Sequence, residues 1–220
     1  MATKKQEKIE TSENTEQRIL EAAQQEFIEK GFNGVRMQAI ADRANVNKAL
    51  LHYYFRTKDK LFKAALQDVM PHLWSNVQKE MATRSNDADL RTLIHSIVAT
   101  YITTFAEKPE VPRFFIREIC NNSPTVNDCL RDIIKAMNVV PTTVFAIYNK
   151  ELAKGTIKQI AVVHFMINLM GMCATTFIIK PVAEILSKDI KHDIVFDAQF
   201  YEQRIRAITE MACDGIFIKH

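Results

Sequence analysis

Hydrophobic and polar residues alternate at helical spacing along most of the chain, and residues 36–62 show the most specific pattern. In this segment, RMQAIADRANVNKALLHYYFRTKDKLF, two short apolar stretches are separated by a polar turn. Asn45 stands where a tight turn needs a positive φ, which Asn tolerates better than most residues. Asn47 is a favourable N-cap for the second helix, and Thr57 is one for a third. The pattern predicts a helix–turn–helix, a unit whose second helix enters the major groove of DNA.

Positive charge is concentrated in the same window. Between Lys30 and Lys63, eight basic residues stand against two acidic ones, a local net charge of +6, whereas the whole chain carries +3. A basic balance confined to one motif is typical of a surface that faces a phosphate backbone. A solvated charged face on an ordinary helical bundle would look similar, but turn, caps and charge all agree on one element.

Three pieces of the chain carry a resemblance to a known family: RILEAAQQEFIEKGF (18–32), IADRANV (40–46) and NKALLHYYFRTKDKLF (47–62). Residues 15–62 resemble the DNA-binding domain of the TetR family of bacterial transcriptional regulators. The resemblance implies an all-helical homodimer that binds a palindromic operator and usually a small effector. The fold expected is all-α, a three-helix DNA-binding domain followed by a larger helical domain. The expected divisions are a flexible N-terminal arm (1–14), the helix–turn–helix domain (15–62, motif about 36–55) and an effector-binding and dimerisation domain (63–220).

The resemblance also assigns positions that face DNA. Lys48, His52 and Tyr53 fall on the face of the recognition helix that meets DNA, and Lys58 matches a lysine that contacts a phosphate. Arg36 replaces the usual Ser or Thr cap, and its guanidinium can still reach a phosphate. Tyr54, from the aromatic pair that closes the motif, suits a hydrophobic core better than a surface that faces DNA. The DNA-binding residues expected are Arg36, Gln38, Asn47, Lys48, Ala49, Leu50, His52, Tyr53, Tyr54 and Lys58.

The rest of the chain is predicted as further helices bent at prolines. Pro71, Pro141 and Pro181 are expected to bend three of them, and Gly155 is expected to end one. The expected helical ranges are about 59–83, 87–107, a short helix from 109, 124–154, an apolar helix up to 187, and a final helix across 201–215.

Two of these helices are candidates for a dimer interface. Residues 159–179, QIAVVHFMINLMGMCATTFII, carry no charge and are long enough to cross a bilayer. Polar residues inside the segment, and the dimerisation role of the penultimate helix in the family, argue for a buried helix without a membrane. The final helix has apolar residues stepping by four and three, as in helix–helix packing. The homodimer residues expected are Met170, Cys173, Phe177, Tyr201, Ile205, Ile208 and Ala212.

The sequence shows no motif for catalysis, a cofactor or a metal: no Gly-rich phosphate loop, carboxylate pair or His/Cys cluster occurs. His95 and His164 are expected to be hydrogen-bonded core residues, and the scattered cysteines reduced core residues or, alternatively, redox sensors. Met and aromatic side chains near the prolines suit a pocket for an apolar or aromatic effector, a cationic one included. The pocket residues expected are Tyr101, Phe105, Phe114, Phe115, Met137, Asn138, His164 and Met166.

These features favour a ligand-responsive DNA-binding regulator, a repressor rather than an activator. The competing interpretation is a helical enzyme or small-molecule carrier whose DNA-binding motif serves only for packing. The N-terminal sequence MATKKQEKIETSEN lacks the apolar run of a signal peptide, so we expect a cytoplasmic protein.

Overall fold

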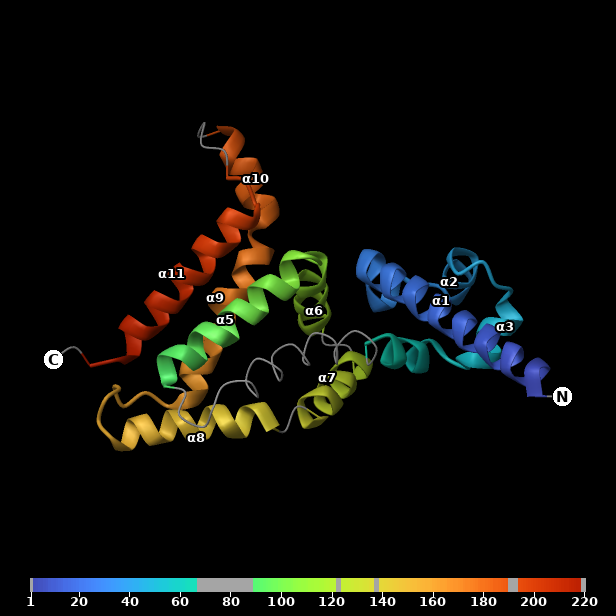
Figure 1. Ribbon diagram of the computed structural model, residues 1–220. Helices are drawn as coiled ribbons and strands as arrows, with labels where there is room; N and C mark the ends of the chain where they lie inside the picture. The colour runs from blue at the N-terminus through green and yellow to red at the C-terminus, as the bar shows by residue number, and fades with distance from the viewer. Residues whose placement is uncertain (1, 67–88, 122–123, 137–138, 190–193, 219–220) are drawn as a thin grey trace. The chain divides into compact units, whose positions relative to one another are not determined.

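The computed structural model describes residues 2–66, 89–121, 124–136, 139–189 and 194–218. Within these ranges every regular element is a helix, apart from an isolated antiparallel bridge between Ile157 and Phe217. The all-α class expected from the sequence is therefore confirmed (Figure 1). The chain divides into two compact units, one formed by Met1–His72 and Phe114–Lys135 and the other by Leu73–Arg113 and Ala136–His220.

The N-terminal unit begins with a long helix, α1 (Ala2–Gly34), followed by α2 (Met37–Arg43), α3 (Lys48–Tyr54) and helical residues 58–66. Helix α1 starts at Ala2 and so includes residues 2–14 of the segment predicted as a flexible arm. The segment contains neither Gly nor Pro and holds three Lys and three Glu, which are good helix formers.

Two later segments complete the N-terminal unit: the second half of α6 (Glu110–Cys120) and most of α7 (Pro124–Ala136). Phe114 of α6 joins an aromatic core in which the Phe62 ring lies 4.9 Å from both Phe27 and Phe32 and 6.1 Å from Phe114. The core is thus built from segments that are distant in the sequence, and α6 closes it.

Polar contacts also hold α6 against the end of α1. The Arg117 guanidinium donates to the carbonyl oxygens of Phe27 and Ile28, at 3.1 and 3.0 Å. The buried Glu118 carboxylate accepts a hydrogen bond of 3.3 Å from the backbone N–H of Phe32. Gly31 lies beside this carboxylate with a φ of 73°, a left-handed conformation that interrupts α1. The end of α1 therefore gains both donors and acceptors from α6.

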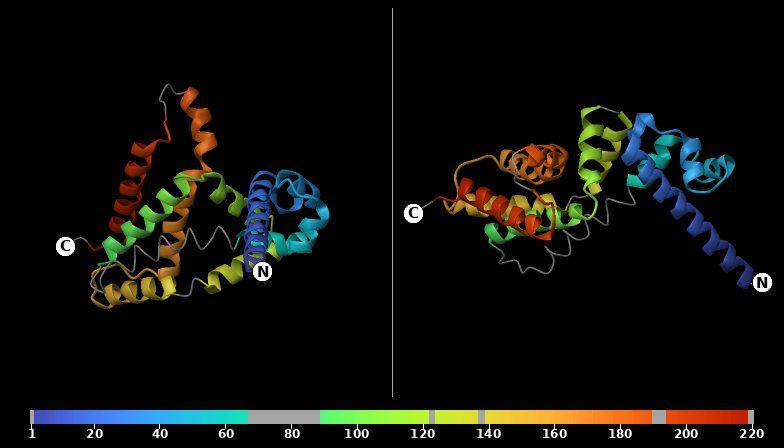
Figure 2. Two further views of the ribbon diagram at one scale, coloured as in Figure 1. Left: turned by 45° about the vertical axis from the view of Figure 1, so that its right-hand side comes forward. Right: turned by 90° about the horizontal axis from the view of Figure 1, so that it is seen from above.

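The C-terminal unit is a layer of helices around α5 (Leu90–Ala106), which packs against α8 (Val139–Ala153), α9 (Val162–Ile178) and α11 (Ala198–Ile216) (Figure 2). Helix α10 (Lys180–Asp189) follows α9. Acidic N-caps start two of the helices: Asp89 accepts from the N–H of Thr92 at 2.7 Å and Asp197 from that of Phe200 at 2.8 Å. These caps fix where the central and final helices begin.

The predicted helix up to residue 187 corresponds to α9 and α10, which meet at a bend of 53°. Pro181 lies in the first turn of α10, where the missing N–H has no helical partner to lose, so the predicted bend near Pro181 is confirmed. The predicted range 124–154 holds α7 and α8; residues 137–138 between them lie outside the described residues, and the bend at Pro141 stays a prediction. Gly155 follows α8 with a φ of 70°, as its predicted role at a helix end requires. The predicted bend at Pro71 falls outside the described residues.

The apolar helix was also considered as a membrane span. Among the described helices, none is long and apolar enough to cross a bilayer by itself. Only the pair Val162–Ile178 and Lys180–Leu186 reaches the required length and composition together, across a bend of 53°.

Candidate nucleic-acid interface

The turn between α2 and α3 has the geometry of a helix–turn–helix. Asn45 adopts a φ of 52°, the positive value predicted for this position. The N–H of Val46 donates to the carbonyl of Ala41 at 3.0 Å and closes the turn. Arg18 of α1 donates to the carbonyl of Ala44 at 2.6 Å, so it satisfies a backbone oxygen that α2 leaves free at its end. The turn is therefore held both locally and from α1.

The predicted caps are confirmed on both sides of α3. The Asn47 side chain accepts a 2.7 Å hydrogen bond from the N–H of Leu50, which starts α3. The Thr57 hydroxyl accepts from the N–H of Lys60 at 3.2 Å and starts the next helix. Because Leu51 is fully buried, α3 is anchored on one side and keeps a fixed orientation on the core.

The opposite side of α3 is open. Lys48, Ala49 and His52 are exposed, and Tyr53 is 79% exposed, the largest value among the big hydrophobic side chains of the described residues. Its ring meets the partly buried Tyr54 ring edge to face, with centroids 5.5 Å apart. An exposed aromatic residue and an exposed lysine on one anchored helix are suited to contact bases and phosphates together.

The remaining predicted contact residues take different positions. Leu50 is partly buried, and Tyr54 packs against the N-terminal core, in agreement with its alternative interpretation as a core residue. Arg36 is exposed at the N-cap of α2 and makes no side-chain cap hydrogen bond. Gln38 is exposed and donates to Asp42 at 2.8 Å. Arg36 therefore has its guanidinium available at the start of α2, while Gln38 is engaged within that helix.

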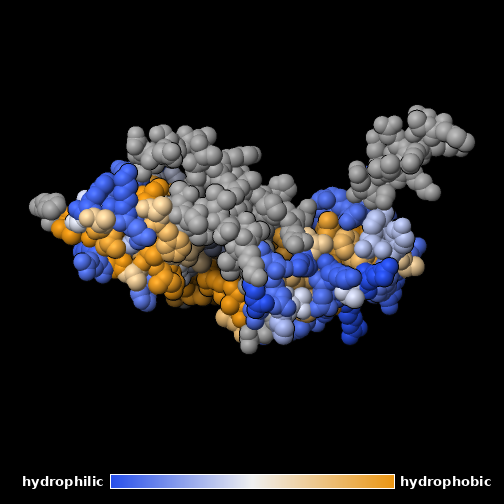
Figure 3. Space-filling model, turned by 90° about the horizontal axis from the view of Figure 1, so that it is seen from below, coloured by the Kyte–Doolittle hydropathy of each residue, from blue (hydrophilic) through white to orange (hydrophobic). Residues whose placement is uncertain are grey.

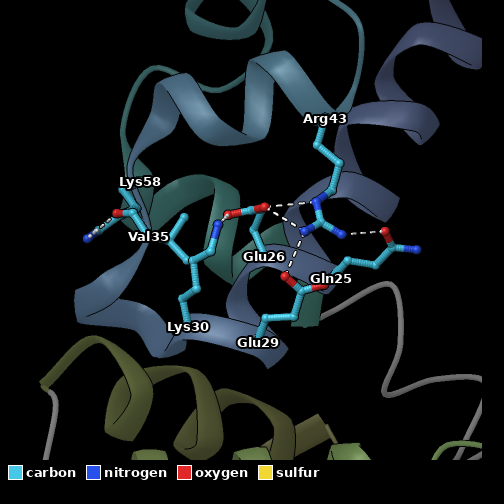
Figure 4. Close-up of polar contacts among 7 residues, drawn as sticks. All are labelled: Gln25, Glu26, Glu29, Lys30, Val35, Arg43 and Lys58. Atoms are coloured by element: carbon cyan, nitrogen blue, oxygen red, sulfur yellow. Dashed lines mark hydrogen bonds and ion pairs between the residues drawn. The ribbon is translucent and has the colours of Figure 1, made fainter.

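A buried carboxylate ties α2 to α1. Glu26 is 3% exposed and forms ion pairs with Lys30 at 2.6 Å and Arg43 at 2.8 Å (Figure 4). Arg43 also pairs with Glu29 at 2.7 Å and bonds to Gln25 at 3.0 Å. Burial acts to raise the pKa of Glu26, but the hydrogen bonds from Lys30 and Arg43 outweigh it and hold that pKa below its ordinary value. The network fixes α2, and with it the start of α3.

The ion pairs show which basic residues remain for DNA. Lys30 and Arg43 pair with Glu26, and Lys63 pairs with Asp132 of α7. The exposed basic residues that form no ion pair within the described part of this window are Arg36, Lys48, Arg56 and Lys60. The excess positive charge predicted from the sequence is therefore concentrated near the ends of α2 and α3.

Lys58 has a mainly internal role in the structure. Its ammonium group is partly buried and donates to the carbonyl of Val35 at 3.2 Å (Figure 4). The same group lies 4.6 Å from the centroid of the Phe32 ring. These contacts fix the chain between α1 and α2. They leave Lys58 less free to reach a phosphate than the exposed Lys48 or Lys60.

The predicted effector residues do not gather in one cluster. Tyr101, Phe105 and Met166 pack on the core of the C-terminal unit, whereas Phe114 and Phe115 belong to the core of the N-terminal unit. Met137 and Asn138 lie outside the described residues. Amphipathic periodicity showed that these helices have apolar faces, but it could not show which core each face joins.

The predicted histidines and cysteines also differ from expectation. His95 and His164 are exposed, so the prediction that they are core histidines was wrong. Cys129, Cys173 and Cys213 are buried as expected, while Cys120 is exposed. No group of three or more metal-ligating His, Cys, Asp or Glu side chains occurs among the described residues.

Most predicted dimer residues are buried inside one chain. Cys173, Phe177 and Ile208 are fully buried, and Tyr201 and Ala212 nearly so; Met170 and Ile205 are partly buried. A side chain without exposed area in one chain adds no contact area with a second, so the predicted face of α9 and α11 was the inward one. The large apolar side chains that α9 exposes are Val163, Ile167 and Ile178. On the face seen in Figure 3, the C-terminal unit shows broad hydrophobic areas and the N-terminal unit is mainly hydrophilic.

The fold and this interface define an all-helical protein with an N-terminal helix–turn–helix unit, and comparisons with known proteins agree. Residues 19–65 match the family described as bacterial regulatory proteins, tetR family. The HTH-type transcriptional regulator RutR of Escherichia coli K12 is 32% identical over 119 residues, which cover 54% of each chain. The resemblance to the TetR family expected from the sequence is therefore confirmed over residues 19–65. The chain matches about half the length of this curated relative.

Solved structures share the fold over nearly the whole chain. A putative tetR family transcription regulator from Shewanella sp. PV-4 superposes with a TM-score of 0.63 at 21% identity, covering 93% of this chain and 99% of that one. The transcriptional regulator FadR from Bacillus subtilis, solved in complex with stearoyl-CoA, superposes with a TM-score of 0.66 at 15% identity, covering 90% and 98%.

Proposed function

We propose that the protein is a DNA-binding transcriptional regulator that occupies a palindromic operator as a homodimer. The observation that carries this proposal is the open side of α3. Lys48, His52 and Tyr53 are exposed there, while Leu51 and the Asn47 cap hold the helix in place. Phosphate contacts from lysine and arginine would position the protein, and the His52 and Tyr53 side chains would read base edges. The bacterial chromosome would place this activity in the cytoplasm.

A homodimer is part of the proposal because a palindromic operator mirrors a two-fold axis. The exposed apolar residues Val163 and Ile167 are four positions apart and share a face of α9, and Ile178 follows near its end. A helix that exposes large aliphatic residues along one face is suited to pack against a second copy of itself. In this proposal the buried residues Cys173 and Ile208 support the interface from inside.

A small effector would control DNA binding by favouring one arrangement of the dimer. If that arrangement moves the two α3 helices away from the spacing of the half-sites, the protein leaves DNA and acts as a repressor that the effector releases. A tenfold to hundredfold effect on DNA affinity corresponds to about 1.4 to 2.8 kcal/mol of coupling. The FadR structure with stearoyl-CoA shows that a protein of this fold accommodates such a ligand.

Selection of binding sites from random duplex DNA, followed by mobility-shift titration, tests the proposal. The expected result is a symmetric consensus whose half-sites lie about one helical turn, or a multiple of it, apart. Two protomers should bind each site. A helical carrier or enzyme that uses the motif only for packing would show weak binding without sequence preference that disappears as salt is raised. That second result would contradict the proposal.

A further inference from the structure

The C-terminal unit contains an aromatic cluster where α5, α9 and α11 meet. The ring of Tyr101 lies 4.6 Å from Phe105, Phe105 lies 6.1 Å from Phe177, and Phe177 lies 5.8 Å from Tyr201. Tyr101 and Phe105 keep part of their surface exposed, whereas Phe177 is fully buried. We call these four residues the aromatic site. The buried rings hold the site in a fixed shape, and the partly exposed rings leave part of its surface accessible to a ligand.

The Tyr101 hydroxyl has no hydrogen-bond partner within the described residues. Burial raises the pKa of Tyr101, so the phenol stays protonated and remains a donor. Tyr148 of α8 behaves differently, because it is fully buried and its hydroxyl donates to the carbonyl of Ile160 at 2.9 Å. A desolvated hydroxyl without a partner destabilises the protein. The Tyr101 hydroxyl thus lacks an acceptor that a ligand could supply.

Arg204 of α11 supplies a positive charge beside the same site. Its Nε donates to the Thr176 hydroxyl at 3.0 Å and its Nη2 to the carbonyl of Met172 at 3.2 Å, and both acceptors are neutral. No carboxylate pairs with this partly buried guanidinium within the described residues. By contrast, Arg43 and Arg117 each pair with a buried glutamate. The charge of Arg204 is therefore oriented by hydrogen bonds but not neutralised.

The two groups lie near each other. Both groups reach the C-terminal part of α9, since the Tyr101 ring lies 6.3 Å from the Phe177 ring and Arg204 donates to Thr176 and Met172. Thr176, which orients Arg204, directly precedes Phe177 of the aromatic site. A polar end with an oriented cation and an unpartnered O–H donor thus adjoins an aromatic surface.

We propose that the aromatic site binds an amphiphilic carboxylate. The carboxylate would accept hydrogen bonds from Arg204 and Tyr101, and the apolar body would pack on Phe105 and the neighbouring rings. Arg is suited to this role because its planar N–H groups match the two carboxylate oxygens. The inference rests on the proposed function, since it names the chemical class of the effector, an organic acid and not the cation that the sequence allowed.

Isothermal titration of the full-length protein without DNA tests the inference, with decanoate and its uncharged match decanamide as probes. The wild type should bind decanoate at least about tenfold more tightly than decanamide, because only the carboxylate forms an ion pair with the guanidinium. Arg204→Gln should remove that preference, and Tyr101→Phe should weaken decanoate binding about threefold to tenfold. Arg206→Gln, an exposed change two residues away on α11, should leave both affinities unchanged.

Several results would overturn the inference. They are equal affinity of the wild type for the two probes, no measurable decanoate binding, or a decanoate preference that survives Arg204→Gln. Sedimentation and circular dichroism show whether the Arg204→Gln variant keeps its fold and its dimeric state. Loss of the dimer together with retained decanoate binding would mean that Arg204 pairs with a second copy of the chain and not with the ligand. If the variant does not fold, the comparison of the two probes on the wild type still decides. Because this titration contains no DNA, its failure and a failure to select an operator are separate outcomes.

Discussion

Replacing Glu26 with Gln removes the buried charge that joins α1 to α2. The change keeps the shape of the side chain but removes both ion pairs, with Lys30 at 2.6 Å and Arg43 at 2.8 Å, and leaves one uncharged amide oxygen as acceptor. The side chains of Lys30 and Arg43 are 47% and 31% exposed, so water can solvate both cations after the change. The free energy of unfolding should therefore fall by about 1.5 to 3 kcal/mol, the contribution of one charge-assisted hydrogen bond. This loss is smaller than the one expected when a buried charge is left without a partner.

Urea unfolding followed by circular dichroism measures this change. Glu29→Gln is the matched control, because Glu29 pairs with the same Arg43 but its side chain is 49% exposed, and we expect a loss below about 1 kcal/mol. The folded pKa of Glu26 lies below its ordinary value of 4.5, so its stabilising effect is present above that pH and is lost as pH falls through the folded pKa. The difference between wild type and Glu26→Gln should shrink accordingly in acid. Equal stability of the two proteins at pH 7 would refute the reasoning.

Three further changes test other parts of the fold. Asn47→Ala removes the cap of α3 and should cost about 0.5 to 2 kcal/mol in urea unfolding; an unchanged midpoint would show that the cap is unimportant. Gly31→Ala places a Cβ 2.7 Å from Glu118 Oε1 at a φ of 73°, and should cost more than about 1 kcal/mol, whereas the control Gly215→Ala meets open space and should be tolerated. Ile167→Asp changes an exposed residue of α9 and should give folded monomers in sedimentation; an intact dimer would place the interface elsewhere.

The helix–turn–helix could be predicted because its signals are local. Asn45, Asn47 and Thr57 each act on backbone atoms within a few residues, so their types alone indicate a turn and two helix starts. The exposed residues of α3, Tyr53 among them, were expected from the resemblance to the TetR family and not from a local signal. The internal contacts of Lys58 could not be predicted, since Val35 and Phe32 reach it only in the folded unit.

The arrangement of the later helices could not be predicted from periodicity. A helix with an apolar face must bury it, but the pattern does not name the partner. Phe114 therefore looked like a pocket residue, although it packs against Phe62. Similarly, the stepped residues of α11 indicated a packed face, and that face meets α5 and α9 of the same chain. One signal was overlooked: Arg204 lies between Tyr201 and Ile208 on this face, where a charge needs a specific partner.

The most direct test of the central claim, that α3 reads DNA, compares one variant in each predicted role. Titrations would use the selected operator and a shuffled duplex of equal length over a range of salt concentrations. Lys48→Ala should weaken binding to both duplexes alike and reduce the log–log slope of affinity against salt by about one for each phosphate that is no longer neutralised, whereas Tyr53→Ala should reduce the preference for the operator. Lys108→Ala, an exposed change in the other unit, should have neither effect. Wild-type affinity, salt dependence and operator preference in both α3 variants would contradict the claim.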